Sequence, residues 1–112
     1  MEPLLPTLRL RKRYIAVVVL GATDVSREAF IAAVSSTGTS LLGDAGFAAA
    51  GISVYGFENG QGIVKCHHTA VSKAIAVLTF ISVLDNRKAV VHTAGVSGTV
   101  KGATTQFFGK KE

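Results

Sequence analysis

The segment ISVYGFENGQGIVKCHH, residues Ile52 to His68, has the sequence pattern of a strand, a tight turn, a second strand and the start of a helix. Glu58-Asn59-Gly60 separates two strand-like stretches, Ile52 to Phe57 and Gln61 to Cys66. Asn and Gly tolerate the positive φ angles that a two-residue hairpin turn prefers, so the two stretches are predicted to be antiparallel neighbours. The rest of the chain has to pack around this hairpin.

A long apolar run follows the hairpin, and Thr69 is the predicted N-cap of a helix that reaches Leu84. This helix has almost no polar stripe, and a helix that is apolar all round is buried all round. One layer of strands cannot cover every side of it in a small domain. Either a protein partner or a second copy covers the remainder, or residues 38–51 fold over it.

The segment from Leu8 to Leu20 is the predicted first strand. Both of its faces are apolar beyond Tyr14, which predicts a central strand that is covered on both sides. Arg9, Arg11 and Arg13 recur at period two, which places them on one face of a regular strand.

The remaining predicted elements occur in a simple order. They are a helix from Ser26 to about Gly38, a short helix within residues 41–50, the hairpin, the long helix, a turn at Asp85-Asn86, a strand from Lys88 to Ala94, and a short C-terminal helix that carries Val100, Ala103 and Phe107 across the uncovered face of the sheet.

The order strand, helix, strand, strand, helix, strand predicts an α+β fold of the ferredoxin-like or RRM-like type, in which four antiparallel strands carry two helices on one face. With 112 residues, 48% of them hydrophobic, the chain can build one core. We therefore predict a single domain over residues 1–112, with residues 1–8 and 109–112 as flexible tails. The longest apolar stretch, Ala74 to Leu84, is too short for a membrane anchor.

The net charge of +5 is concentrated at the two ends of the chain. Residues 1–13 contain four basic residues and one acidic residue, residues 14–97 contain five of each, and residues 98–112 contain three basic residues and one acidic residue. Clustered basic residues favour a polyanionic partner, above all nucleic acid. The alternative is ordinary solubilising charge on frayed termini. The single cysteine excludes an internal disulfide and indicates a reducing cytoplasm.

Four residues suggest catalysis or metal binding, namely Cys66, His67, His68 and His92. In an extended strand Cys66 and His68 share one face while His67 points away, which suits zinc poorly. A nucleophilic Cys-His pair would also need an orienting group and an oxyanion site that the sequence does not reveal. We therefore predict no catalytic residue and no metal site.

Two features bear on how RNA would be bound. Gly95-Val96-Ser97-Gly98 matches a G-x-x-G string, which is either a turn with positive φ or a set of backbone N–H groups open to a phosphate. Aromatic residues for base stacking are scarce on the predicted central strands, where only Tyr14 is available. The sequence therefore predicts contacts mainly to phosphates.

Three segments, taken together, resemble one known family. They are Arg11-Lys12-Arg13-Tyr14-Ile15, Gly60 to His68 (GQGIVKCHH) and Gly95 to Lys101 (GVSGTVK), in that order. The chain is similar over about residues 7–108 to the archaeal ribonuclease P protein component 2 family, which is related to a eukaryotic subunit of ribonuclease P and RNase MRP. It departs from the family pattern at Lys65, where arginine is usual; lysine keeps the charge but loses the bidentate geometry.

The resemblance implies an RRM-like fold and a role in removing the 5′ leader from precursor tRNA. It implies that a catalytic RNA performs the cleavage with Mg²⁺, that this chain binds no cofactor, and that it works with ribonuclease P protein component 3 in a dimer of heterodimers. The residues expected to face RNA are Arg9, Arg11, Lys12, Arg13, Lys65, His67 and Lys101. The residues expected to face the protein partner are Val77, Phe80, Ile81 and Leu84.

Two other classes of protein stay open at this point. A ferredoxin-like regulatory domain would need a polar pocket for a small ligand, and the N-terminal arginines argue against it. An autonomous thiol enzyme would need Cys66.

Overall fold

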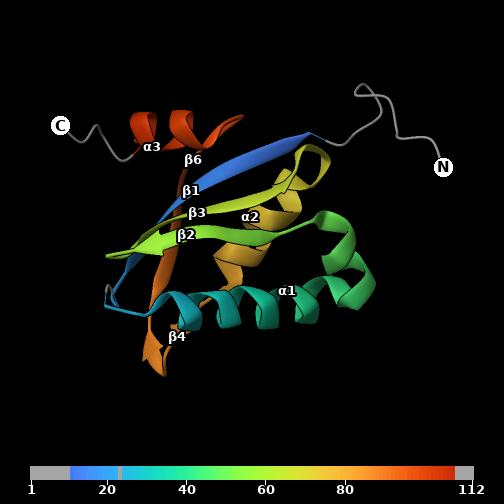
Figure 1. The fold of residues 1–112 in the computed structure, drawn as a ribbon. Coiled ribbons are helices and arrows are strands. Elements are labelled where there is room, and N and C mark those ends of the chain that lie inside the picture. The colour runs from blue at the N-terminus through green and yellow to red at the C-terminus, as the bar shows by residue number, and fades with distance from the viewer. Residues whose placement is uncertain (1–10, 23, 108–112) are drawn as a thin grey trace.

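Four antiparallel strands form one sheet in the computed structural model. The structure describes residues 11–22 and 24–107, and for residues 106 and 107 it describes the backbone only. The strand order is β2-β3-β1-β6, and Figure 1 shows α1 and α2 on one side of the sheet and α3 on the other. The predicted α+β class is confirmed. The elements are β1 (Lys12–Leu20), α1 (Arg27–Ala50), β2 (Ser53–Glu58), β3 (Gln61–His67), a 3₁₀ turn (His68–Ala70), α2 (Val71–Phe80), β4 (Val83–Leu84), β5 (Arg87–Lys88), β6 (Val90–Ser97) and α3 (Val100–Phe107).

The hairpin of β2 and β3 has the predicted turn. Asn59 has a φ of 55° and Gly60 a φ of 77°. Glu58 pairs with Gln61 across the turn, so the loop contains two residues, as the Asn-Gly signal requires.

The pairing of β1 with β3 decides which side chains face the core. Ile15 lies opposite Val64, and both are fully buried on the side of α1 and α2. Tyr14 lies opposite Lys65, and because successive residues of a strand alternate, this pair points to the other side. We call that side of the sheet, which α3 partly covers, the open face.

The prediction that the first strand is central and covered on both sides is confirmed. β3 and β6 flank β1, and α3 packs against β1 and β6 on the open face. Ala16 of β1 and Ala103 of α3 are both fully buried there. The C-terminal helix is therefore present as predicted. The predicted strand residues 8–10 lie outside the described residues, and β1 begins at Lys12.

α1 is longer than predicted. Ser26 caps it as expected, because its Oγ accepts the N–H of Ala29 at 3.1 Å. The helix does not end near Gly38 but continues to Ala50 through a break at Gly43 (φ 76°, ψ 165°), so the predicted helix at 41–50 is its second half. Gly38 lies inside the helix, and the ring of Phe47 occupies the space where a Cβ would be, so a larger residue at this position would clash with it.

α2 is shorter than predicted at both ends. Thr69 does not cap it, because the 3₁₀ turn comes first and no side chain accepts a capping hydrogen bond. After Phe80 the chain makes the small β4–β5 hairpin through Asp85 (φ 53°) and Asn86 (φ 63°), which confirms the predicted turn there. Arg87 then binds Asp24 at 2.8 Å and ties this hairpin to the loop before α1. The last strand of the sheet starts later than predicted, at Val90, and ends at Ser97.

Most of the expected protein-partner face is buried inside the chain. Val77, Ile81 and Leu84 are 0%, 3% and 1% exposed, because α1 packs beside α2 and the sheet lies beneath them. A partner cannot reach these three residues in this fold, so the expectation is corrected for them. Phe80 alone of the four is exposed, at 63%. Within the described residues, no helix combines the length and apolarity needed to cross a bilayer.

We predict that Gly51→Ala destabilises the fold by about 1–2 kcal/mol or more. Gly51 ends α1 with a φ of 66°, and an added Cβ would lie 2.6 Å from Nε2 of His67. The measurement is equilibrium urea unfolding. Gly98→Ala is the matched control, since its Cβ would meet nothing within 4 Å and its φ is not in the left-handed range. Equal midpoints for the two variants would contradict this account of Gly51.

Candidate nucleic-acid interface

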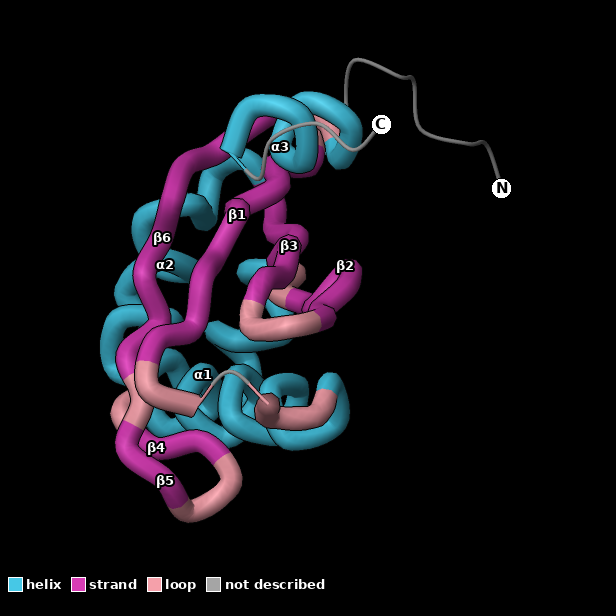
Figure 2. The backbone as a smooth tube through the Cα atoms, turned by 90° about the vertical axis from the view of Figure 1, so that its left-hand side faces the viewer, coloured by secondary structure: helices cyan, strands magenta, loops and turns pink. Residues whose placement is uncertain are grey.

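Segments that are far apart in the sequence bring basic side chains to one end of the open face. Tyr14 of β1 lies between Lys65 of β3 and Ser97 of β6. Lys12 precedes Tyr14 by two residues, so it shares that face and is exposed. α3 starts soon after Ser97 and lies over the end of β1 and β6 in Figure 2, with Lys101 exposed in its first turn. Three lysines are thus gathered at the Tyr14 end of the sheet.

The expected row of arginines is less uniform than the sequence predicts. Arg9 lies outside the described residues. Arg11 is exposed just before β1. Arg13 lies opposite the buried Cys66, on the side of the helices, and its guanidinium donates to the carbonyl oxygen of Lys12 at 3.0 Å. Strand alternation therefore separates Arg13 from the lysines of the open face.

His67 is engaged within the fold. Its Nδ1 lies 3.0 Å from the carbonyl oxygen of Ala49, and because a carbonyl only accepts, Nδ1 carries the proton in this contact. The ring also packs against Gly51. His67 therefore holds the C-terminal end of α1 against the end of β3, and we leave it out of the interface for that reason.

The candidate catalytic residues do not converge. Cys66 is fully buried in the core on the helix side, and burial raises the pKa of its thiol, against a smaller opposing effect of Arg13. His92 lies opposite Val18, on the open face. Among residues 11–22 and 24–107 there is also no cluster of three or more His, Cys, Asp or Glu side chains that could hold a metal ion.

The G-x-x-G string does not form the turn with positive φ that is one of its two interpretations. Neither Gly95 nor Gly98 has a positive φ, and Gly95 lies within β6. The N–H of Thr99 donates to Oγ of Ser97 at 3.3 Å, and Oγ1 of Thr99 accepts the N–H of Gly102 at 2.9 Å. Thr99 thus caps the start of α3, and the N–H groups of Thr99 and Gly102 are used inside the fold.

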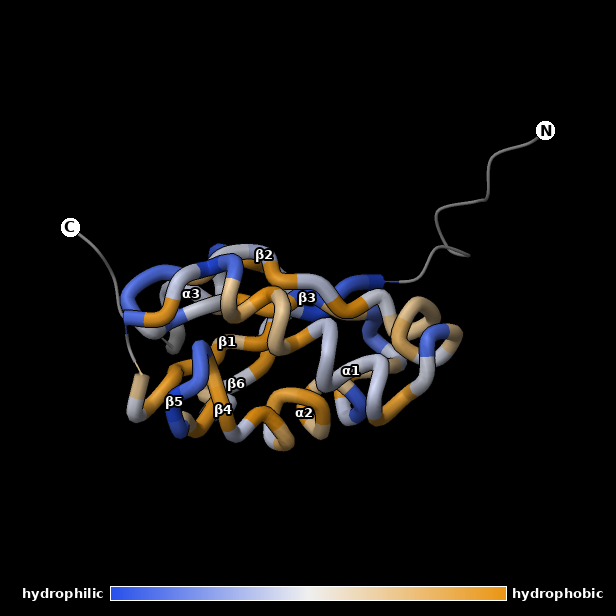
Figure 3. Tube along the Cα trace, turned by 90° about the horizontal axis from the view of Figure 1, so that it is seen from below, coloured by the Kyte–Doolittle hydropathy of each residue, from blue (hydrophilic) through white to orange (hydrophobic). Residues whose placement is uncertain are grey.

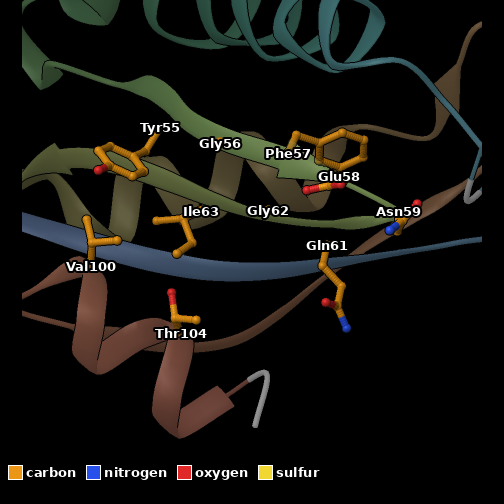
Figure 4. A pocket seen from close by; sticks show the side chains of 10 residues that line it. All are labelled: Tyr55, Gly56, Phe57, Glu58, Asn59, Gln61, Gly62, Ile63, Val100 and Thr104. Atoms are coloured by element: carbon orange, nitrogen blue, oxygen red, sulfur yellow. The ribbon is translucent and has the colours of Figure 1, made fainter. Parts of the chain in front are cut away.

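A groove of about 620 Å³ lies on the open face between the β2–β3 hairpin and α3. Figure 4 shows Tyr55 of β2 and Val100 of α3 on its two sides, with Ile63 of β3 between them. Tyr55 is 54% exposed, and its ring meets that of Tyr14 edge to face with centroids 6.1 Å apart. The groove therefore adjoins the gathered lysines.

Tyr55 is the residue that sequence reasoning missed. In a regular strand Tyr55 and Phe57 would share one face. The β2–β3 register shifts between Val54 and Gly56, and this irregularity separates them. Phe57 turns to the core, where it stacks on Phe30 with centroids 4.4 Å apart, while Tyr55 contacts Tyr14 on the open face. The glycine beside Tyr55 was the available signal, because a glycine within a strand often marks a bulge.

Comparison with known proteins gives a consistent result. The sequence model of the Rpp14/Pop5 family matches residues 13–108. Ribonuclease P protein component 2 of Methanosarcina mazei is 43% identical over 96% of this chain and 92% of its own length. That of Archaeoglobus fulgidus is 36% identical over 96% of this chain and 97% of its own length. A chain in the cryo-EM structure of yeast ribonuclease MRP shares the fold, with a TM-score of 0.67 and 9% identity over 81% of this chain and 76% of that chain.

We predict that replacing both Lys12 and Lys65 by Gln weakens binding to RNA. Loss of two phosphate contacts should reduce the slope of log K against log salt by roughly 1.4, at roughly 0.7 per contact for a single strand. The measurement is RNA affinity over a range of salt concentrations. The matched control is the double variant Arg27→Gln and Lys73→Gln, which removes exposed charges from the two helices on the other side of the sheet. The same slope in both double variants would remove Lys12 and Lys65 from the interface.

We also predict that Cys66 is unreactive in the folded chain. A buried thiol with a raised pKa holds less thiolate at a given pH, and the thiolate is the nucleophile. Iodoacetamide near pH 8 should therefore label native Cys66 far more slowly than urea-unfolded Cys66. Cys66→Ala should keep RNA binding. Comparable labelling rates in the two states would contradict this and would reopen the thiol-enzyme hypothesis.

Proposed function

The chain belongs to the Rpp14/Pop5 family, and we infer from this membership that it is a protein subunit of ribonuclease P. The observation that carries the inference is that the relationship extends over nearly the whole chain, including the sheet and α3. As such a subunit it is part of an endoribonuclease ribonucleoprotein and is not itself the catalytic component.

We propose that the chain assists a catalytic RNA in removing the 5′ leader from precursor tRNA in the cytoplasm. The RNA would hold the Mg²⁺ that the cleavage uses, and this chain would bind no cofactor. Its contribution would be to neutralise phosphates where RNA strands come together. The exposed Lys12 and Lys101 and the half-buried Lys65, at the Tyr14 end of the open face, support this role, since phosphate contacts supply much of the affinity of RNA-binding proteins.

The proposed RNA interface is narrower than the set predicted from the sequence. It consists of Lys12, Lys65 and Lys101, and it includes Arg11, which is exposed just before β1. Arg13 would contribute only from the edge of the helix side. Arg9 belongs to the proposal through the resemblance alone.

We further propose that ribonuclease P protein component 3 is the protein partner, in a dimer of heterodimers, and that it binds at the opposite end of β1. Exposed apolar side chains gather there. Leu20, the last residue of β1, pairs with Val90, the first residue of β6, and they are 53% and 60% exposed; Val83 is 53% exposed. Together they line a shallow apolar groove. Phe80 extends the apolar surface from the end of α2, and Figure 3 shows the hydrophobic character of α2 and β4.

The two proposed surfaces do not compete. Tyr14 and Leu20 are six residues apart on the same strand, which corresponds to roughly 20 Å. RNA at one end and a protein at the other can therefore be bound simultaneously.

The decisive experiment is a cleavage assay with the cognate catalytic RNA at limiting Mg²⁺. Precursor tRNA is incubated with component 3, and this chain is either added or withheld. We expect cleavage at the 5′ leader to be stimulated only when both proteins are present. If the RNA is active at high Mg²⁺ but this chain has no effect at low Mg²⁺, the proposed function is wrong, and a different RNA partner or a small-ligand domain becomes the better hypothesis.

A further inference from the structure

The groove on the open face has a composition that phosphate contacts alone do not explain. One side is the exposed ring of Tyr55, and Ile63 and Val100 add apolar surface beside it. Neutral polar side chains follow along the groove, namely those of Asn59, Gln61 and Thr104. A flat apolar wall with amide and hydroxyl groups near it can hold a planar ring and hydrogen-bond its edge.

The ring of Tyr55 is held in place without being covered. Its edge-to-face contact with Tyr14 has an interplanar angle of 83°, and such pairs restrict ring motion. More than half of its surface nevertheless stays accessible. An aromatic ring that is fixed and exposed at the same time is suited to stacking, because little conformational entropy is lost when a ligand binds to it.

The charges around the groove favour one orientation of a bound nucleotide. Glu58 lies at the hairpin end and repels phosphate. Lys65 lies opposite Tyr14, and Lys12 is on the same face two residues before Tyr14, so positive charge is concentrated at the other end. A nucleotide in the groove would therefore place its base near Tyr55 and its phosphate toward Lys65.

We propose that this groove binds one unpaired nucleobase of an RNA strand, stacked on Tyr55, with the adjoining phosphate on Lys65. The inference rests on the proposed function as an RNA-binding subunit and adds a contact to a base. The base must be unpaired, because a base inside a helix has both faces covered by its neighbours. The nearby lysines favour RNA over an apolar peptide as the occupant.

The chain contains its own reporter for this contact. It has no tryptophan and two tyrosines, and both tyrosines lie at this site. In the Tyr14→Phe variant all tyrosine fluorescence therefore comes from Tyr55, and phenylalanine retains the ring that packs against it. We expect a single-stranded ten-nucleotide oligoadenylate to quench this fluorescence, and a duplex of the same length not to.

The affinity of three variants for the same oligoadenylate separates stacking from charge. Tyr55→Ala should weaken binding roughly fivefold to 150-fold, with the salt slope unchanged, because no phosphate contact is lost. Tyr55→Phe should bind as the wild-type chain does, since the ring is retained. Leu41→Ala is the matched control, because it removes an exposed apolar side chain from α1, on the other side of the sheet and outside both proposed binding surfaces. Circular dichroism of each variant checks that the fold is intact.

Wild-type affinity in Tyr55→Ala would overturn the proposal, and so would the absence of quenching by oligoadenylate. Neither result would by itself affect the proposed function, which the reconstituted cleavage assay tests separately. Stimulated cleavage together with wild-type affinity in Tyr55→Ala would leave a ribonuclease P subunit that contacts RNA through phosphates only. An apolar peptide that competes with oligoadenylate and quenches Tyr55 more strongly would replace RNA as the occupant and so overturn the proposal as well.

Discussion

The register between β1 and β3 is the constraint on which the rest of the molecule depends. Side chains alternate along a strand, so a slip by one residue would exchange every core side chain with a surface one. In the observed register, Ile15 and Val64 meet under the helices, while Tyr14 and Lys65 meet on the open face. The same pairing that builds the core therefore also builds the basic surface, and neither can be changed independently of the other.

The two sides of the sheet have different roles: one side forms the core, and the other side is available for binding. The space between the helices and the sheet is filled by the chain's own residues, with Phe30 on Phe57 and Val77 against the sheet, and Phe80 stays exposed at the end of α2. The open face is only partly covered, because α3 crosses β1 and β6 and leaves the β2 side free. Binding functions thus fall to the free part of the sheet and to the apolar end near Val90, where side chains are not required for the core.

Local signals in the sequence predicted the elements well and their ends poorly. The Asn59-Gly60 turn and the Ser26 cap were identified correctly, because each depends on a few adjacent atoms. The end of α1 was not, because Gly38 lies inside the helix, where the ring of Phe47 occupies the space that a Cβ would take. Likewise, the uniformly apolar sequence of α2 indicated that this helix is buried, but it did not indicate which element packs against it. In the structure, α1 packs against α2.

The sequence by itself determined the fold class, the family resemblance and the excess of positive charge, because these follow from residue patterns and their spacing. Only the tertiary structure decided which charges share a surface. Alternation and pairing bring Lys12 and Lys65 together and turn Arg13 to the other side, and the irregularity in β2 places Tyr55 on the open face. Surfaces formed from several strands depend on register and bulges, which are set by contacts between segments that are distant in the sequence.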